Sequence, residues 1–595
     1  LATIAWFPIR SIAGGIDPHA LGVGVAGHAF DHLGSLGEQA AAATQSGSTI
    51  LYATGFGWMY EGMRPPAEMA HAKDEIAAYV RGAKRDGIRL AIGYVCATSI
   101  AGLDRFDRNW PAEFRAKFSS GPSAWLQRDA DGKPMPSWYG GEYRPACMNN
   151  PDWRAYEKYV VRLQLEAGMD GIFFDNPAVH PQGCYCDDCM RRFAAFLDHR
   201  GANVGLGRDA SPSAWRTIAN TRTDDFLRFR ASIAADFLAD MRAYARTIKP
   251  GALVTCNNSL NSPDVLFRQC RTYGYNIDAL SRVEDLVVVE DMTSQPRVLA
   301  NGTTVEYGPT YEVLRSVSHG KPVVAIALAD GDYHTPPDLT RLAMAEAAAH
   351  GASYLLWPTW PAEQRQRMID AVRPESDLLR ANASLLQDAA GRADVAVFLP
   401  FDEWVTTADC RPMRLAQALG AANVQFEVID AEDLRNGKLD AGKTAALLIE
   451  SADGLWADDK RAVEAFRAAG GTVVSADRAD WLKAIRNAVA HPSATIQGPG
   501  TLRVVVRDQP GRTIVHVLNL NVKRISSFED AVTPAEDVRL TIRIPRGAVR
   551  SVRAITADPG ATQGPIESHA DPDGGGAAVG IRLPRVVLST MLVIE

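Results

Sequence analysis

Short apolar segments alternate with amphipathic ones over the first two thirds of the chain. The apolar runs end at turn residues, whereas the segments between them carry apolar residues at the spacing of a helix face. Strands are predicted at Ala2–Phe7, Thr49–Thr54, Arg89–Cys96, Gly171–Phe174, Ala252–Asn257, Leu286–Glu290, Pro322–Ala327 and Ser353–Trp357. Helices are predicted between them, for example at Ala67–Asp86, Asp152–Ala167, Asp224–Ile248 and Leu339–His350. Eight strands that alternate with helices favour a closed (β/α)8 TIM barrel over an open doubly wound sheet.

The last third of the chain changes its pattern twice. Between about residues 394 and 482, four short strand patterns alternate with helical ones, which predicts a small flavodoxin-like α/β domain. After residue 491, strand patterns separated by Gly, Pro and Asp follow one another without a convincing helix, which predicts a C-terminal β-sandwich. The α/β chain is therefore expected to contain a barrel at 1–388, a flavodoxin-like domain at 389–490 and a β-sandwich at 491–595.

Two connections in the predicted barrel are much longer than a strand-to-helix loop requires. They are Ala97–Asn150 and Asn176–Arg222, and both follow the carboxyl end of a predicted strand, where a barrel builds its site. A third segment, Gly22–Gly27, matches G-x-G-x-x-G but does not directly follow a predicted strand. We interpret it as a loop and not as a dinucleotide site.

Three of the eight cysteines lie inside the second long connection, within a stretch of six residues. Cys184, Cys186 and Cys189 form a C-x-C-x2-C pattern, and thiolates this close together can bind one Zn²⁺, whereas disulfides between them would be strained. Cys147, at the end of the other long connection, is the expected fourth ligand. Four thiolates leave no open coordination position, so the predicted zinc is structural and joins the two connections. The alternative is a group of buried free thiols.

The sequence around these cysteines resembles the zinc loop of the family 42 glycoside hydrolases, the β-galactosidase family. The resemblance is carried by Gly183–Phe193 (GCYCDDCMRRF), by Arg144–Cys147 (RPAC) before a predicted helix, and by Asp225–Phe229 (DFLRF). The order of barrel, flavodoxin-like domain and small β-domain is also similar. The resemblance implies a glycosidase fold, a structural zinc with Cys147 as its fourth ligand, and a trimer.

Candidate catalytic acids stand at the ends of two predicted strands. Glycoside cleavage needs two carboxyl groups across the scissile bond, and a barrel places them at the carboxyl ends of its strands. The fourth predicted strand leads directly into Asp175, and the sixth ends at Glu290, which Asp291 follows. An acid that directly follows an apolar run needs partners, and such partners can tune its pKa. The alternative role for Asp175 is a cap or a loop contact.

The family 42 pattern differs from this chain at these acids. That pattern has an Asn-Glu pair where this chain has Phe174-Asp175, and a Glu at the end of the seventh strand, which is absent from Val323–Asp330. An Asp after the fourth strand with an acid after the sixth resembles the retaining α-glycosidases and α-fucosidases, in which that Asp is the nucleophile. We therefore expect Asp175 to be the nucleophile and Glu290 the acid/base, with Asp291 as the substitute for Glu290. Asp330 and Asp332 are reserve candidates.

Aromatic and amide side chains near the predicted strand ends are candidate sugar-binding groups. Flat rings can stack on the apolar face of a pyranose, and amides can bond its hydroxyls, although rings at strand ends are also common packing residues. The candidates are Trp6, Trp58, Tyr94, Asn176, Asn257 and Trp357.

Composition and charge exclude several other classes of function. The 595 residues are 46% hydrophobic and 22% charged with a net charge of −7, which excludes a disordered chain and makes a nucleic-acid partner unexpected. No apolar run is long enough to span a membrane. The chain begins with Leu1, so the sequence leaves the compartment open between cytoplasmic and secreted.

The expected function is hydrolysis of a terminal glycosidic bond in an oligosaccharide or glycoside substrate, with retention of configuration. We expect a homo-oligomer, with a trimer favoured. Three alternatives remain at this point: a β-galactosidase-like enzyme in which Asp175 is the acid/base, a non-catalytic carbohydrate-binding barrel, and a barrel enzyme of another chemistry such as a lyase or isomerase.

Overall fold

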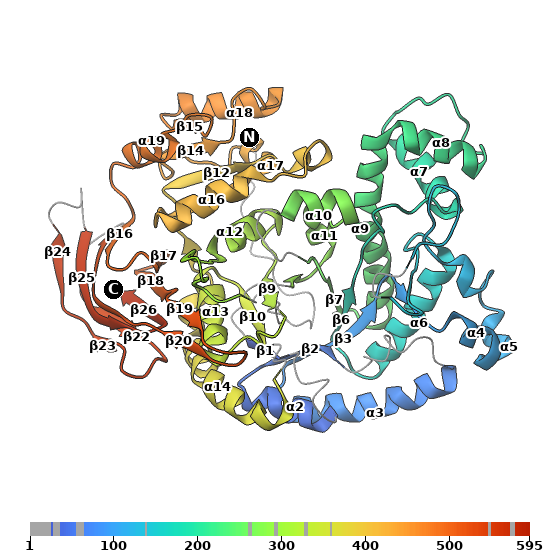
Figure 1. Ribbon diagram of the computed structural model, residues 1–595, viewed down its shortest axis with the longest axis horizontal. Helices are drawn as coiled ribbons and strands as arrows, with labels where there is room; N and C mark the ends of the chain where they lie inside the picture. Colours follow the sequence, from blue (N-terminus) through green and yellow to red (C-terminus); the bar gives the residue numbers. More distant parts are fainter. Residues whose placement is uncertain are drawn as a thin grey trace.

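Eight parallel strands form the centre of the first part of the molecule (Figure 1). The structure, a computed structural model, describes residues 25–27, 36–54, 65–136, 140–259, 265–290, 295–326, 331–356, 360–544, 549–571 and 578–595. The strands are β1 (Val25–Gly27), β2 (Ile50–Thr54), β3 (Leu90–Cys96), β6 (Gly171–Asp175), β7 (Leu253–Cys256), β8 (Val287–Val289), β9 (Val323–Ile326) and β10 (Ser353–Leu356). They are hydrogen-bonded in the order β7-β6-β3-β2-β1-β10-β9-β8. A parallel bridge between Asn257 and Val288 joins the two outer strands, so the sheet closes into a ring that we call the barrel.

Helices follow these strands and cover the outside of the ring. They are α2 (Leu36–Gln45), α3 (Pro66–Arg85), α6 (Pro151–Glu166), α9 (Thr223–Ile248), α10 (Leu266–Tyr273), α11 (Ile277–Val283), α12 (Gly308–Val317), α13 (Pro337–Ala349) and α14 (Arg365–Ala381). A 3-10 turn at Ala362–Gln364 precedes α14, and a short α15 (Ala383–Leu386) follows it. Strands β3 and β6 are buried along their whole length, as expected for a parallel sheet that is filled inside and covered outside. The predicted α/β class is therefore confirmed.

The two long connections contain secondary structure of their own. The first insertion, after β3, holds β4 (Ser99–Ile100), α4 (Leu103–Asn109), α5 (Ala112–Arg115), a 3-10 turn (Pro122–Ala124) and β5 (Arg144–Pro145). The second insertion, after β6, holds α7 (Asp187–His199) and α8 (Pro212–Thr221). A cluster of buried rings, which includes Phe106, Trp110 and Trp125, packs the first insertion against Tyr156 of α6. The insertions are therefore ordered parts of the fold.

A second α/β unit follows the barrel. Its sheet is parallel, in the order β13 (Phe426–Asp430), β12 (Val395–Leu399), β14 (Ala446–Ile449) and β15 (Thr472–Ser475). Its helices are α16 (Arg411–Ala421), α17 (Ala431–Arg435), α18 (Ala457–Ala468) and α19 (Trp481–Ala488), with a 3-10 turn at Phe401–Val405. Figure 1 shows this unit, in orange, beside α12, and α12 packs against β13 and α16.

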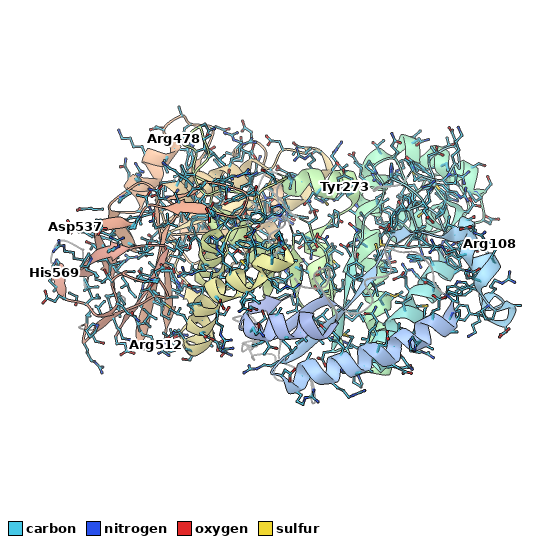
Figure 2. The ribbon with its side chains drawn as sticks, turned by 60° about the horizontal axis from the view of Figure 1, so that its bottom comes forward. Arg108, Tyr273, Arg478, Arg512, Asp537 and His569 are labelled. Atoms are coloured by element: carbon cyan, nitrogen blue, oxygen red, sulfur yellow. The ribbon has the colours of Figure 1, made fainter. Side chains whose placement is uncertain are left out.

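Antiparallel strands make up the C-terminal part. One sheet has the order β11 (Ala390–Gly391), β17 (Leu502–Gln509), β18 (Arg512–Asn519), β26 (Ser589–Ile594), β22 (Val552–Ile555) and β23 (Gly564–Pro565). The other has the order β16 (Ala494–Gln497), β21 (Ala535–Arg543), β25 (Ala578–Val586) and β24 (Ser568–Asp571), and a hairpin pairs β19 (Val522–Arg524) with β20 (Asp530–Val532). Apolar residues from both sheets share one core, for example Val504, Val515, Leu540 and Ile581. In Figure 2, Asp537 and His569 of these sheets lie at the opposite end of the molecule from Arg108 of the first insertion.

One strand of the ring differs from the prediction. The predicted strand Ala2–Phe7 lies outside the described residues, and β1 is instead Val25–Gly27, within the segment predicted as a loop. Three residues that include Ala and Gly are too short to show a strand pattern, and their conformation is set by pairing with β2 and β10. The other seven predicted strands of the barrel overlap strands of the ring. Among the described residues, no helix combines the length and the apolar character needed to cross a membrane.

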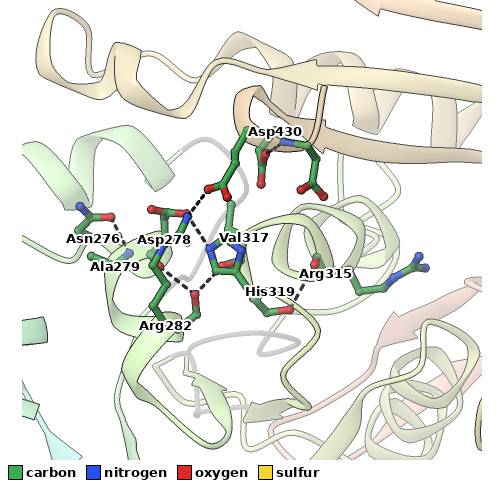
Figure 3. A network of polar contacts seen from close by, with 12 residues as sticks. Asn276, Asp278, Ala279, Arg282, Arg315, Val317, His319 and Asp430 are labelled. Atoms are coloured by element: carbon green, nitrogen blue, oxygen red, sulfur yellow. Dashed lines mark hydrogen bonds and ion pairs between the residues drawn. The ribbon is translucent and has the colours of Figure 1, made fainter. Parts of the chain in front are cut away.

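Charged side chains join the barrel to the second α/β unit (Figure 3). The Asp278 carboxylate of α11 lies 2.8 Å from His319 Nε2 and 3.2 Å from Arg282 Nη2, and Arg282 also contacts Glu432 of α17 at 2.8 Å. Burial opposes the charge of Asp278, but the hydrogen bonds from His319 and Arg282 outweigh it and lower the pKa of this carboxyl. The contacts of Asp278 with His319 and Arg282 are therefore strongest when Asp278 is ionised.

Candidate active site and metal centre

Three polar residues meet where β6, β7 and β8 end. Asp175 is the last residue of β6 and is buried, Asn257 directly follows β7, and Glu290 directly follows β8 and is half-buried. The backbone N–H of Asn257 donates to Phe174 O, which places Asn257 beside the end of β6. Because parallel strands of a barrel end on the same face, the three side chains lie at the face that carries active sites in this architecture.

The Asn257 amide bridges the two carboxylates. Its Nδ2 donates to Asp175 Oδ1 at 2.9 Å and to Glu290 Oε2 at 2.5 Å, while its Oδ1 accepts from the backbone N–H of Ser259 at 2.8 Å. The last bond identifies which amide atom is the oxygen, so the NH2 group faces the acids. Asp175 Oδ1 and Glu290 Oε2 are therefore at most 5.4 Å apart, the two N···O distances of 2.9 and 2.5 Å in a straight line.

Other donors hold the Asp175 carboxylate. Tyr94 OH donates to Oδ2 at 2.6 Å, and the Asn176 side chain donates to the same oxygen at 2.9 Å. The backbone N–H of Asn176 donates to Oδ1 at 2.9 Å. Asn176 adopts a left-handed backbone with φ of 49°, a conformation that Asn tolerates better than most residues and that turns its amide back toward Asp175. The orientation of this carboxylate is therefore fixed from several sides.

Some of the other sequence candidates lie beside Asp175, and others do not. Tyr94 and Asn176, expected at the sugar, contact Asp175, and Tyr94 is buried inside the ring. Asp332, a reserve acid, is exposed and lies 2.7 Å from Arg524 of the C-terminal hairpin. Four further candidates and the other reserve acid fall outside the described residues: Trp6, Trp58, Asp291, Trp357 and Asp330.

Sequence reasoning missed Glu284, which lies behind the pair. It is fully buried and accepts hydrogen bonds from the backbone of Cys256 and the side chain of Asn258. Burial raises the pKa of Glu284 to about 8. Glu284 precedes β8 and does not end a strand, so the rule that catalytic acids stand at strand ends does not select it.

The four cysteines of the two insertions converge. All four are buried, and their Sγ atoms lie within 4.8 Å of one another, with Cys147 Sγ 3.4 Å from Cys186 Sγ and 3.5 Å from Cys189 Sγ. Four sulfurs around one zinc at about 2.3 Å are about 3.8 Å apart, so the group has the size of a tetrahedral thiolate site. Among the described residues, this is the one group of His, Cys, Asp or Glu side chains close enough to hold a metal ion.

Groups around the cysteine cluster can stabilise negative charge on sulfur. Cys186 caps the amino end of α7 and Cys189 lies in its first turn, where the helix dipole stabilises negative charge. Asn149 Nδ2 donates to Cys189 Sγ at 3.3 Å. Burial acts to raise the pKa of Cys184, yet hydrogen bonds from the neighbouring thiols hold that pKa well below its usual value, while hydrogen bonds within the same cluster raise the pKa of Cys147 and of Cys189 well above theirs. The donor set therefore fits a soft divalent metal ion, which would join the first insertion to the second.

Comparison with known proteins gives matches in structure alone. No family model matches the chain, and no curated protein matches it. An α-L-fucosidase, isoenzyme 2 from Paenibacillus thiaminolyticus, matches with a TM-score of 0.63 at 15% identity over 96% of this chain and 98% of that one. A β-galactosidase from Bacillus circulans sp. alkalophilus matches with a TM-score of 0.63 at 14% identity over 96% and 99% of the two chains.

A third match comes from an archaeon. The β-galactosidase of the Antarctic haloarchaeon Halorubrum lacusprofundi has a TM-score of 0.55 at 17% identity over 96% of this chain and 99% of that one. The two enzyme classes that the motifs and acids resemble are thus both represented among the structural matches. The chain has the fold shared by these fucosidase and β-galactosidase structures.

Proposed function

We propose that this chain is a retaining glycoside hydrolase that cleaves a terminal glycosidic bond, with Asp175 as nucleophile and Glu290 as acid/base. The observation that carries the proposal is the shared Asn257 amide, which joins the two carboxylates at the ends of β6 and β8. The fold shared with a fucosidase and β-galactosidases supports the same class of reaction.

The spacing of the two acids supports retention of configuration. Retaining glycosidases hold their carboxyl groups about 5–5.5 Å apart, whereas inverting enzymes need about 6.5–9.5 Å to admit a water molecule. Two oxygens that share one amide nitrogen at 2.9 and 2.5 Å are at most 5.4 Å apart, which is below the spacing of the inverting enzymes. The pair therefore suits direct attack by one carboxylate on the sugar.

The proposed roles divide the reaction into two steps. An Asp175 oxygen attacks the anomeric carbon while the protonated Glu290 gives its proton to the departing glycosidic oxygen. This step breaks the glycosidic bond and forms a glycosyl ester on Asp175. Glu290, now ionised, takes a proton from water, and the resulting hydroxide attacks the anomeric carbon and releases Asp175. The donors around Asp175, Tyr94 among them, hold it in line with the sugar.

Mechanism-based labelling tests the proposal. The protein is first screened against nitrophenyl glycosides of several sugars in both anomeric forms, and a matching 2-deoxy-2-fluoro glycosyl fluoride is then used for labelling. We expect a covalent adduct on the peptide that contains Asp175 and loss of turnover in Asp175→Asn with the fold intact. Absence of hydrolysis across the panel, or an adduct on another residue, would refute it.

A second variant separates the two possible roles of the acids. Glu290→Gln should retain measurable cleavage of dinitrophenyl glycosides, because these leaving groups need no proton. If Asp175→Asn shows that behaviour instead, Asp175 is the acid/base, as in the β-galactosidase-like alternative. If neither variant loses turnover, the barrel does not use this pair.

We further propose that the cysteine cluster binds structural zinc through Cys147, Cys184, Cys186 and Cys189. Bound Zn²⁺ would cross-link the two insertions, and its four thiolate ligands would leave no coordination position open for substrate. The domain boundaries at 388 and 490, the β-sandwich assignment, the homotrimer, and sugar stacking by Trp6, Trp58 and Trp357 remain proposals. Light scattering tests the trimer, and metal analysis tests the zinc.

A further inference from the structure

A buried acid fills the seam between β7 and β8. Glu284 is 0% exposed, and its Oε2 accepts from the backbone N–H of Cys256 at 3.1 Å. Both of its carboxyl oxygens accept from Asn258 Nδ2, at 3.1 and 3.0 Å. Among the described residues, strands β7 and β8 share one β-bridge, from Asn257 to Val288, and the N–H of Asp285 also donates to Val254 O at 2.8 Å. Because this ladder is short, side-chain hydrogen bonds add to the contact between the two strands.

The seam leads directly to the catalytic pair. Glu284 holds the residue on either side of Asn257, because it bonds both Cys256 and Asn258. Asn258 also reaches across to β8, where its backbone N–H donates to Val288 O at 3.0 Å. One buried carboxyl therefore holds the residues on both sides of Asn257, whose amide oxygen is also held by the N–H of Ser259.

We propose that Glu284 is a positioning residue of the active site: its carboxyl fixes the turn at 256–258 so that the Asn257 amide reaches Asp175 and Glu290 together. The inference rests on the proposed function, since that proposal assigns the two acids. It adds a residue that neither touches the sugar nor lies at a strand end.

The variants follow from the protonation of Glu284. Because burial raises its pKa to about 8, the group is neutral at pH 6, and Glu284→Gln preserves its charge and size there. Glu284→Leu keeps the bulk but removes every hydrogen bond. Asn258→Ala cuts the same link from the other side and serves as the second variant in case Glu284→Leu does not fold.

Glu375 of α14 provides a matched control. It is also buried, at 2% exposed, and burial also raises its pKa to about 8, but it packs near Arg341 and Asp558 and not at the ends of β6 to β8. Glu375→Leu therefore removes a buried acid of the same kind without touching the seam. Any loss of activity that merely reflects a weakened core should appear in both leucine variants.

Kinetics at pH 6, on the nitrophenyl glycoside that the wild type cleaves, give the first test. We expect kcat to fall about 10- to 100-fold in Glu284→Leu and in Asn258→Ala, with KM changed less than about 3-fold, because misplacement of the acids affects the chemical step. Glu284→Gln should keep kcat within about 3-fold, and Glu375→Leu should leave both constants near their wild-type values. An unchanged kcat in Glu284→Leu, or an equal loss in Glu375→Leu, would overturn the inference.

A crystal structure of Glu284→Leu gives a test that does not depend on turnover. We expect Asn257 Nδ2 to lie beyond hydrogen-bonding distance of at least one of the two carboxylates. If Asn257 still bonds both, Glu284 does not position it, whatever the protein cleaves. If the wild type cleaves no glycoside but the amide moves in the variant, the proposed function fails and the positioning role stands.

Discussion

Glu375 allows the cost of a buried acid to be measured through folding alone. It lines a small cavity with His516 and Thr590 between α14 and the C-terminal strands. Its pKa of about 8 in the folded protein compares with about 4.3 in an unfolded chain. Between about pH 4.3 and pH 8, the folded state therefore keeps a proton on Glu375 that the unfolded state has lost.

The sign of the effect follows from that difference. A group whose folded pKa is raised contributes stability that is fully present below its unfolded pKa and is lost as the pH rises through its folded pKa. Each pH unit in this window removes about 1.4 kcal/mol, so the loss is about 5 kcal/mol in all, of which about 4 kcal/mol falls between pH 5 and pH 9. Glu375→Gln stays neutral throughout, and its stability relative to the wild type should therefore rise with pH.

Thermal unfolding followed by circular dichroism between pH 5 and pH 9 tests this prediction. An unfolding entropy of about 2.1 cal/mol/K per residue converts the loss into a Tm difference of about 3 °C if all 595 residues unfold together. The Gln variant should equal or fall slightly below the wild type at pH 5 and exceed it by about this amount at pH 9. The exposed Glu113 serves as control, because Glu113→Gln should show no such trend. A Tm difference that is the same at every pH would refute the reasoning.

Three further predictions concern ion pairs and the nucleophile. Asp278→Asn should destabilise the protein by about 2 kcal/mol at neutral pH, because it removes the contact between the carboxylate and His319. The pKa of Asp278 is lowered in the folded protein, so the stabilisation is lost as this acid is protonated and the difference should shrink below about pH 4. Urea unfolding at pH 3 and pH 7 checks this prediction. Tyr94→Phe should lower kcat about 10-fold with little change in KM, since it removes one hydrogen bond from Asp175, the proposed nucleophile; steady-state kinetics on the cleaved nitrophenyl glycoside check it. Glu306→Gln should cost about 3 kcal/mol, because it leaves the buried guanidinium of Arg503 without its charge partner; the urea midpoint checks it.

The periodic parts of the fold could be predicted from the sequence. Strands such as β3 and β6 are continuous apolar runs that end at turn residues, and burial on both sides makes such runs easy to recognise. Strand β1 could not be predicted, because Val25–Gly27 is held by its neighbours in the ring and carries no pattern of its own. The cysteine cluster could be predicted because thiol spacing limits what the residues can bind.

The contacts among the acids could not be predicted. That Asn257 touches both Asp175 and Glu290 depends on where side chains point at the ends of three neighbouring strands, which the pattern of apolar residues along the chain does not specify. The ion pair of Asp332 with Arg524 joins segments far apart in the sequence, which the pattern does not specify either. A strand-end rule selects acids by position along the chain, whereas burial and partners are properties of the folded molecule.

The cysteine cluster and the proposed nucleophile, Asp175, share one segment of chain, and its contacts predict what loss of the proposed zinc would do. Between Asp175 and Cys184, the chain is tied to the first insertion by its own hydrogen bonds: Gln127 Nε2 donates to Ala178 O at 3.1 Å, and the N–H of His180 donates to Gln127 Oε1 at 2.8 Å. These bonds lie between the acid and the cluster, so they should hold the acid in place when the cluster carries no metal ion. Cys147→Ser should therefore lose bound zinc by metal analysis and unfold at a lower temperature, yet keep kcat within about 3-fold at 25 °C. A large fall in kcat at a temperature where the variant remains folded would show instead that the metal, and not this hydrogen-bonded segment, holds the nucleophile in place.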